Sequence, residues 1–257
     1  MPERAARRGL AERLFAGLVA CAGLAIATSA NADDASDTGW RLTGDLGLGA
    51  LQTSAIAPGA PKRHHVIPYA YADAGPLFAR EDTFGVKLLP MGWGSLELAA
   101  RYSTEGTDAD VPGQAHRANP RPLGLGTFQE TPWGGIFLNA FVDTVSGGSL
   151  LEASYAAQFN LGPLTVYPQL GVARRSQRYV DHLYGVAAGD PSGLPAYRPG
   201  AALTPTLSGS MEWPLGAHWV LLGHVERERF DRAITASPRV DAAGRTVWLL
   251  AFARRFG

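Results

Sequence analysis

The sequence predicts an all-β protein, an antiparallel up-and-down β-barrel of the outer-membrane type with about twelve strands. Three observations lead to this fold class. Bulky apolar residues alternate with small or polar ones along much of the chain after residue 32, which is the period of a β-strand. The chain contains 31 glycines and 18 prolines, which disfavour long helices. Lysine, which is common on the exposed face of a soluble sheet, occurs only at Lys62 and Lys87.

Residues 1–32 have the three parts of a secretory signal peptide. Four arginines form a basic start, and an apolar stretch follows from residue 14 to about residue 28. The stretch closes on the small-residue cleavage site Ala30-Asn31-Ala32. An N-terminal anchor helix is disfavoured because the apolar run is short for a membrane span. A lipobox around Cys21 is disfavoured because the residues after it stay small and apolar. We therefore expect cleavage after Ala32, leaving one domain over residues 33–257.

The charge of the processed chain argues against nucleic acid as a partner. The whole chain has a formal net charge of zero, and residues 1–32 carry four arginines and two glutamates. Their removal leaves a net charge near −2, whereas binding to phosphates needs a basic face. The predicted barrel implies outer-membrane lipid as a partner.

The predicted strands follow one another with an apolar face and a polar face. The segments, in chain order, are 39–51, 66–74, 77–89, 94–103, 122–130, 133–143, 149–160, 163–175, 203–213, 218–229 and 246–256. Charged and polar side chains should point into the lumen, because exposing charges to lipid costs about 2–4 kcal/mol at the midplane. The residues expected to do so are Glu97, Arg101, Glu152, Gln158 and Glu212.

Eleven segments conflict with the even strand number of single-chain bacterial barrels. We expect residues 176–186 to supply a twelfth strand. The alternative is ten strands, if the two segments near residues 66–89 merge. The connections near residues 160–163 and 214–218 are tight, whereas those near 103–121, 174–202 and 230–245 are long. Short periplasmic turns and long outer loops are typical of such barrels.

Aromatic residues lie where the interfaces of a bilayer would meet the strands. These residues are Trp40, Trp93, Trp133, Trp213, Trp219, Tyr102 and Phe252. The chain also ends on TVWLLAFARRFG, in which Trp248, Leu250, Phe252 and Phe256 share one face. A last strand that ends on an aromatic residue resembles the insertion signal of outer-membrane barrels, although Arg254 interrupts the apolar face. The alternative is the C-terminal strand of a periplasmic sandwich.

The stretch from Tyr179 to Val240 resembles the MipA/OmpV family, outer-membrane β-barrels named for an MltA-interacting protein. Pro68, Gly171-Val172 and the strand with Gly47 and Gly49 also fit, while His182, Leu183 and Arg239 depart from the family pattern. The motif residues are Tyr184, Gly185, Val186, Gly193, Leu194, Pro195, Tyr197, Ser237 and Pro238. We interpret them as loop architecture in preference to ligand binding.

The resemblance implies a non-enzymatic barrel without a cofactor. Its expected role is a scaffold for enzymes of the cell wall, with a murein transglycosylase and a murein polymerase as partners. The alternative is a narrow pore or a surface-exposed adhesion barrel, which would use the lumen or the long loops.

The histidines give no convincing catalytic or metal site. Asp181-His182 with the nearby Ser176 is the best candidate for nucleophilic catalysis, but no nucleophile motif accompanies it. His64-His65 lack evident third ligands for a metal. His224 lies beside Glu226 and is expected in the lumen or at its rim. We therefore expect no catalytic residue and no metal site.

Overall fold

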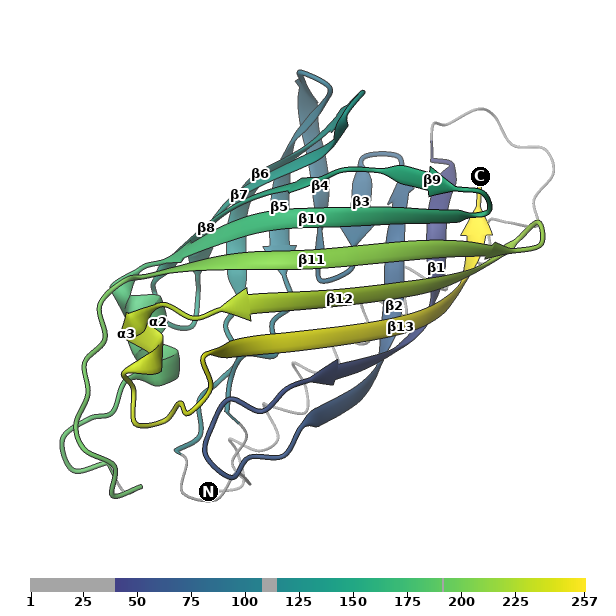
Figure 1. Ribbon diagram of the computed structural model, residues 1–257. Coiled ribbons are helices and arrows are strands. Elements are labelled where there is room, and N and C mark those ends of the chain that lie inside the picture. Colours follow the sequence, from purple (N-terminus) through teal and green to yellow (C-terminus); the bar gives the residue numbers. More distant parts are fainter. Residues whose placement is uncertain (1–39, 108–114, 191) are drawn as a thin grey trace, which may run out of the picture.

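Twelve antiparallel strands close into a barrel in the computed structural model, which describes residues 40–107, 115–190 and 192–257 (Figure 1). The strand segments are β1 (Leu42–Thr53), β2 (Arg63–Ala74), β3 (Leu77–Arg80), β4 (Thr83–Met91), β5 (Gly94–Arg101), β6 (Pro122–Thr131), β7 (Gly134–Asp143), β8 (Ser149–Ala156), β9 (Phe159–Leu161), β10 (Leu164–Arg175), β11 (Ala202–Leu215), β12 (Trp219–Arg229) and β13 (Gly244–Phe256). Two short helices are described, α2 (Gln177–Tyr184) and α3 (Arg232–Thr235). Segments β8 and β9 both pair with β10 and form one strand of the wall. The predicted fold class is confirmed.

The ring closes between the first and last strands. β1 pairs with β13 in one continuous register from Gly44 opposite Phe256 to Thr53 opposite Val247. The two backbones approach closely at Gly47, where an added Cβ would lie 2.1 Å from a carbonyl oxygen of β13. Only a glycine fits at this position without a shift of one of the strands.

The predicted alternation separates an apolar outer surface from a polar lumen. Outside, Leu170, Leu207 and Leu250 are each more than half exposed. Inside, Arg101 of β5 forms an ion pair with Glu152 of β8. Because β6 and β7 lie between those two strands, this ion pair crosses the interior of the barrel.

Other lumen charges are paired in the same way. Glu97 is buried and accepts a hydrogen bond from Arg80 at 3.0 Å. Arg255 bonds to Glu212 at 2.8 Å, and β12 lies between their strands. Gln158 is exposed between β8 and β9 and donates to the side chain of Asn160, which also accepts from Thr165. Thr165 lies opposite Glu212 on the lumen face, so all five polar residues predicted to face inward lie on that face.

The predicted number of twelve strands is confirmed, but its predicted origin is wrong. Residues 176–186 do not form a strand, because Gln177–Tyr184 is the helix α2. The extra strand comes instead from the segment 77–89, which folds into the hairpin of β3 and β4. The turn between them uses Glu81, whose φ of 55° is the left-handed conformation, and neither glycine nor proline marks it in the sequence.

The two ends of the barrel differ as predicted. Five connections of two or three residues, 75–76, 92–93, 132–133, 162–163 and 216–218, lie at one end, which we call the turn end. The opposite end, which we call the loop end, carries the connections 54–62, 102–121, 144–148, 176–201 and 230–243, and the short turn 81–82 between β3 and β4 also points toward it. Figure 1 shows α2 and α3 at the loop end, far from the C-terminus. Neither of these helices is long and apolar enough to cross a membrane. The expected signal peptide, residues 1–32, lies outside the described residues.

Candidate functional site

A core of buried side chains covers the loop end, and we call this region the cap. In α2, the residues Tyr179, Val180, Leu183 and Tyr184 are buried, and this spacing places them on one face of the helix. They form one apolar cluster with Ile234 of α3 and with residues from the ends of several strands. The cap is therefore a packed structure and not a set of separate loops.

Several residues of the family motif hold the cap together. Val186 and Tyr197 form an isolated antiparallel bridge with backbone hydrogen bonds of 2.8 and 2.9 Å. The hydroxyl of Tyr197 donates to the carbonyl oxygen of Ala233 at 3.1 Å. The hydroxyl of Ser237 donates to the carbonyl oxygen of Tyr184 at 2.6 Å. These contacts join α2, the connection that follows it, and the connection after β12.

The remaining motif residues form turns and a helix end. Gly185 follows α2, and its N–H donates to the carbonyl oxygen of Asp181 at 2.9 Å. Gly193 has a φ of 73°, a conformation that favours glycine. Leu194 and Pro195 continue the same connection, and Pro238 follows Ser237 directly.

A buried group of charges fastens the cap to the barrel wall. Glu105 accepts hydrogen bonds from Arg175, Arg245 and the hydroxyl of Tyr179, each at 3.0 Å. Both arginines also pair with Glu228, at 2.7 and 3.0 Å. Burial opposes the ionised form of Glu105, but the two arginines outweigh it and hold its pKa at about 2. The connection after β5 is thus tied to β10, β12 and β13.

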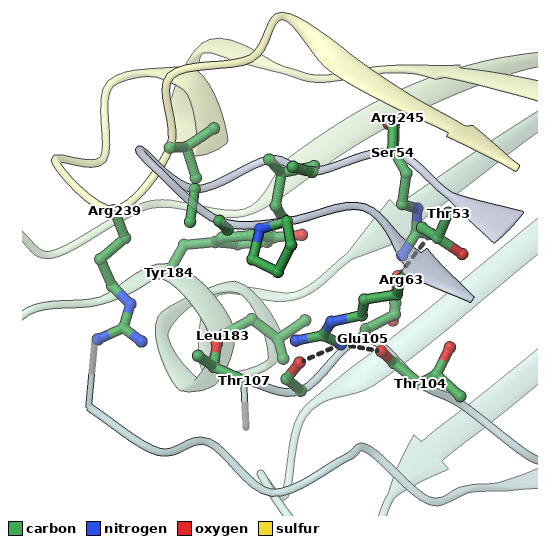
Figure 2. A pocket seen from close by; sticks show the side chains of 17 residues that line it. Thr53, Ser54, Arg63, Thr104, Glu105, Thr107, Leu183, Tyr184, Arg239 and Arg245 are labelled. Carbon is green, nitrogen blue, oxygen red and sulfur yellow. Dashed lines mark hydrogen bonds and ion pairs between the residues drawn. The ribbon is translucent and has the colours of Figure 1, made fainter. Parts of the chain in front are cut away.

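A cavity of about 210 Å³ lies in the cap beside this charge group (Figure 2). Its walls come from the connection between β1 and β2, the segment 104–107, the end of α2 and the connection before β13. Arg63, at the start of β2, reaches across to the segment 104–107 and donates to the carbonyl oxygens of Thr104 and Gly106 at 3.1 and 3.0 Å. Sequence reasoning missed Arg63, Glu105 and Arg245, because they come from distant segments without a local motif.

The candidate catalytic residues take separate partners. The hydroxyl oxygen of Ser176 accepts from the N–H of Ser149 at 2.8 Å. The Nε2 atom of His182 lies 2.9 Å from the carbonyl oxygen of Ala118. The structure therefore does not bring Ser176 and His182 together.

Three other histidines, His64, His65 and His224, lie in β2 and β12. His64 and His65 are consecutive in β2, so their side chains point to opposite faces of the sheet. In the lumen, Nδ1 of His224 lies 2.8 Å from the hydroxyl of Ser210. Within residues 40–107, 115–190 and 192–257, no three His, Cys, Asp or Glu side chains are grouped to hold a metal.

Comparison with known proteins decides the family. The family described as "MltA-interacting protein MipA" matches residues 46–256, which include β2 to β13 and the cap. The chain belongs to the MipA family. The resemblance inferred from the motif residues is therefore confirmed.

Two relatives from Escherichia coli (strain K12) are similar to this MipA-family chain. "Putative outer membrane protein YiaT" is 25% identical over 206 residues, which cover 76% of this chain and 84% of the relative. "MltA-interacting protein" is 29% identical over 129 residues, which cover 49% of this chain and 52% of the relative. The likeness to the first extends over most of both proteins, and the likeness to the second over about half of each.

Proposed function

We propose that this protein is an outer-membrane barrel whose turn end docks a murein transglycosylase of the MltA type. Family membership carries the proposal, together with the name of the relative that is 29% identical. The closed barrel with an apolar outer surface suits a bilayer, since the pairing of β1 with β13 removes the first and last edges of the sheet. The name of the more extensively matched relative supports the outer membrane.

The geometry of the two ends supports docking at the turn end. Barrels of this type keep their short turns and both termini on the periplasmic side, which is where an enzyme of the murein layer works. The cap would then face outward. The surface available to a periplasmic partner is the ring of short turns.

Two exposed tryptophans in the short turns are suited to the centre of a binding surface. Trp93 and Trp133 are 62% and 71% exposed, and their rings meet edge to face with centroids 6.3 Å apart. Both lie in the turns themselves, in 92–93 and 132–133. The backbone N–H of Trp93 donates to the side chain of Gln129, and the backbone carbonyl oxygen of Trp133 accepts from the hydroxyl of Tyr155. Both turns are therefore held in place. Tryptophan is enriched among the residues that dominate binding energy.

A pull-down from detergent or lipid nanodiscs tests the proposal with a purified MltA-type transglycosylase. We expect the double variant Trp93→Ala/Trp133→Ala to weaken binding about tenfold or more. The matched control is Trp213→Ala/Trp219→Ala, because those tryptophans lie within strands at the same end of the barrel. Failure of the unaltered protein to retain the enzyme would contradict docking. Equal retention by both double variants would contradict only the assignment to the tryptophan pair.

A murein polymerase is the second partner that the resemblance implies. We expect it to join a complex that already contains the transglycosylase. Size-exclusion chromatography of the three proteins together measures this, and separate elution of the polymerase would limit the proposal to one enzyme.

Ion pairs that cross the lumen argue against the alternative of a pore. Ion pairs join strands that are not neighbours, as in Arg101 with Glu152 and Arg255 with Glu212. Such pairs place side chains across the interior and narrow it. We expect no conductance steps in a planar bilayer, and regular steps would support the pore.

A further inference from the structure

The cavity in the cap has the size of a site for one small ring. Its volume is about 210 Å³, and a dry engineered cavity of about 150 Å³ holds benzene. A benzene ring with one small substituent therefore fits, whereas drug-sized ligands occupy larger pockets of about 300 Å³ or more.

The walls combine apolar surface with one buried hydroxyl. Ile56, Pro61, Leu183 and Val240 supply much of the apolar lining. Tyr184 lies among them and is 4% exposed, and burial raises the pKa of its hydroxyl. Figure 2 shows Tyr184 and Leu183 between Arg239 and Arg63. An apolar ring could pack against these side chains.

Arg239 supplies the chemistry that selects a ligand. It is 2% exposed and lines the cavity. Its Nη2 atom donates to the carbonyl oxygen of Ala115 at 2.7 Å, but its Nη1 atom is buried and has no hydrogen-bond partner among the described residues. Buried polar groups are usually paired, and an unpaired donor on a charged group is especially costly.

Among the described residues, the charge of Arg239 is only partly compensated. Burial lowers the pKa of its guanidinium, repulsion from Arg117 lowers it further, and Asp190 offsets part of the effect. Glu105 also lines the cavity, but its carboxylate is already bonded to Arg175 and Arg245. An anion bound at Arg239 would supply an acceptor and a negative charge that the described residues do not provide.

We propose that this cavity binds a small organic anion, in which a carboxylate reaches Arg239 and an apolar ring packs against Leu183, Tyr184 and Val240. A carboxylate matches the planar fork of a guanidinium better than a spherical ion does. The inference does not depend on the proposed docking of a murein enzyme, which concerns the opposite end of the barrel.

Binding of 4-fluorobenzoate to the protein in detergent micelles, followed by ¹⁹F NMR, tests the proposal. We expect saturable binding that Arg239→Gln weakens about tenfold or more, since hydrogen bonds to charged groups are the stronger kind. The control variant Arg198→Gln removes an exposed arginine that does not line the cavity, and it should bind as the unaltered protein does. The uncharged 4-fluorobenzyl alcohol should bind at least about tenfold more weakly than the benzoate.

A second variant covers the case in which Arg239→Gln disturbs the cap. Ala57→Phe fills the cavity from the connection between β1 and β2 without changing any charge, and it should abolish binding. Protease resistance of the loop end shows that the cap is intact in each variant. The proposal is overturned if the benzoate does not bind the unaltered protein. It is also overturned if the alcohol binds equally well, or if Ala57→Phe with an intact cap still binds.

Discussion

Replacing Glu105 with glutamine should lower the free energy of unfolding by an amount that follows from the pKa of Glu105. The carboxylate of Glu105 lies between Arg175 and Arg245, and its pKa falls from 4.5 to about 2. A difference of one pKa unit corresponds to about 1.4 kcal/mol, so the ionised form contributes roughly 3 kcal/mol to folding at neutral pH. Glutamine keeps the size of the side chain but removes its charge. We therefore expect Glu105→Gln to lower the free energy of unfolding by roughly 3 kcal/mol at pH 7.

The same ion group predicts the sign of the pH dependence. The pKa of Glu105 is lower in the folded protein than in the unfolded chain, so its contribution is complete above about pH 4.5 and is lost as the pH falls toward 2. At pH 3 the difference between the unaltered protein and Glu105→Gln should shrink to roughly 1 kcal/mol.

Urea unfolding from lipid vesicles, followed by tryptophan fluorescence at pH 7 and pH 3, measures both quantities. Glu130→Gln is the control, because Glu130 is an exposed residue of β6, and it should change stability by less than about 0.5 kcal/mol. Two results would refute the reasoning. One is equal stability of Glu105→Gln and the unaltered protein at pH 7, and the other is a difference of the same size at both pH values.

Three further substitutions test the pairing of β1 with β13 and the packing of the cap. Gly47→Ala should weaken closure of the barrel, because the added Cβ would lie 2.1 Å from a carbonyl oxygen of β13. The temperature at which the protein shifts its migration on a gel should therefore fall. The control Gly209→Ala should leave this temperature unchanged, because its added Cβ would meet nothing within 4 Å. Ile234→Ala removes a fully buried side chain of the cap and should lower the stability of the cap by about 2–4 kcal/mol. Proteolysis at the loop end should become faster, and an unchanged cleavage rate would contradict the packed cap. Ser237→Ala removes the hydrogen bond to the carbonyl oxygen of Tyr184 and should lower the stability of the cap by about 1–3 kcal/mol. Hydrogen exchange near the end of α2 should become faster, and unaltered exchange would count against this role for the hydroxyl.

Much of the barrel wall could be predicted because alternate residues along a strand face opposite sides of the wall. The outer side is apolar and the lumen side is polar, so the sequence pattern indicates which side each residue faces. Leu207 and Leu250 face outward and Glu97 and Glu152 face inward, as their positions in the pattern require. The strand count was harder to derive. The hairpin of β3 and β4 turns at Glu81, a residue type that gives no turn signal, so the segment 77–89 was predicted as one strand.

The cap could be predicted only in part. The motif residues pointed to the right region, and α2 was missed because its eight residues lie within a connection that was read as a strand. The charge group was missed for a different reason. Glu105 and Arg245 are 140 residues apart, and no local pattern indicates that a loop residue will pair with the start of the last strand.

The pairing of β1 with β13 has a consequence for biogenesis. Because these are the first and last strands of the wall, a ribosome must finish β13 before the cylinder can be completed. Until then the outer edges of β1 and β12 present unsatisfied backbone groups, which are templates for aggregation. Closure of the cylinder is therefore the last pairing that the chain can make, and it depends on its two most distant strands.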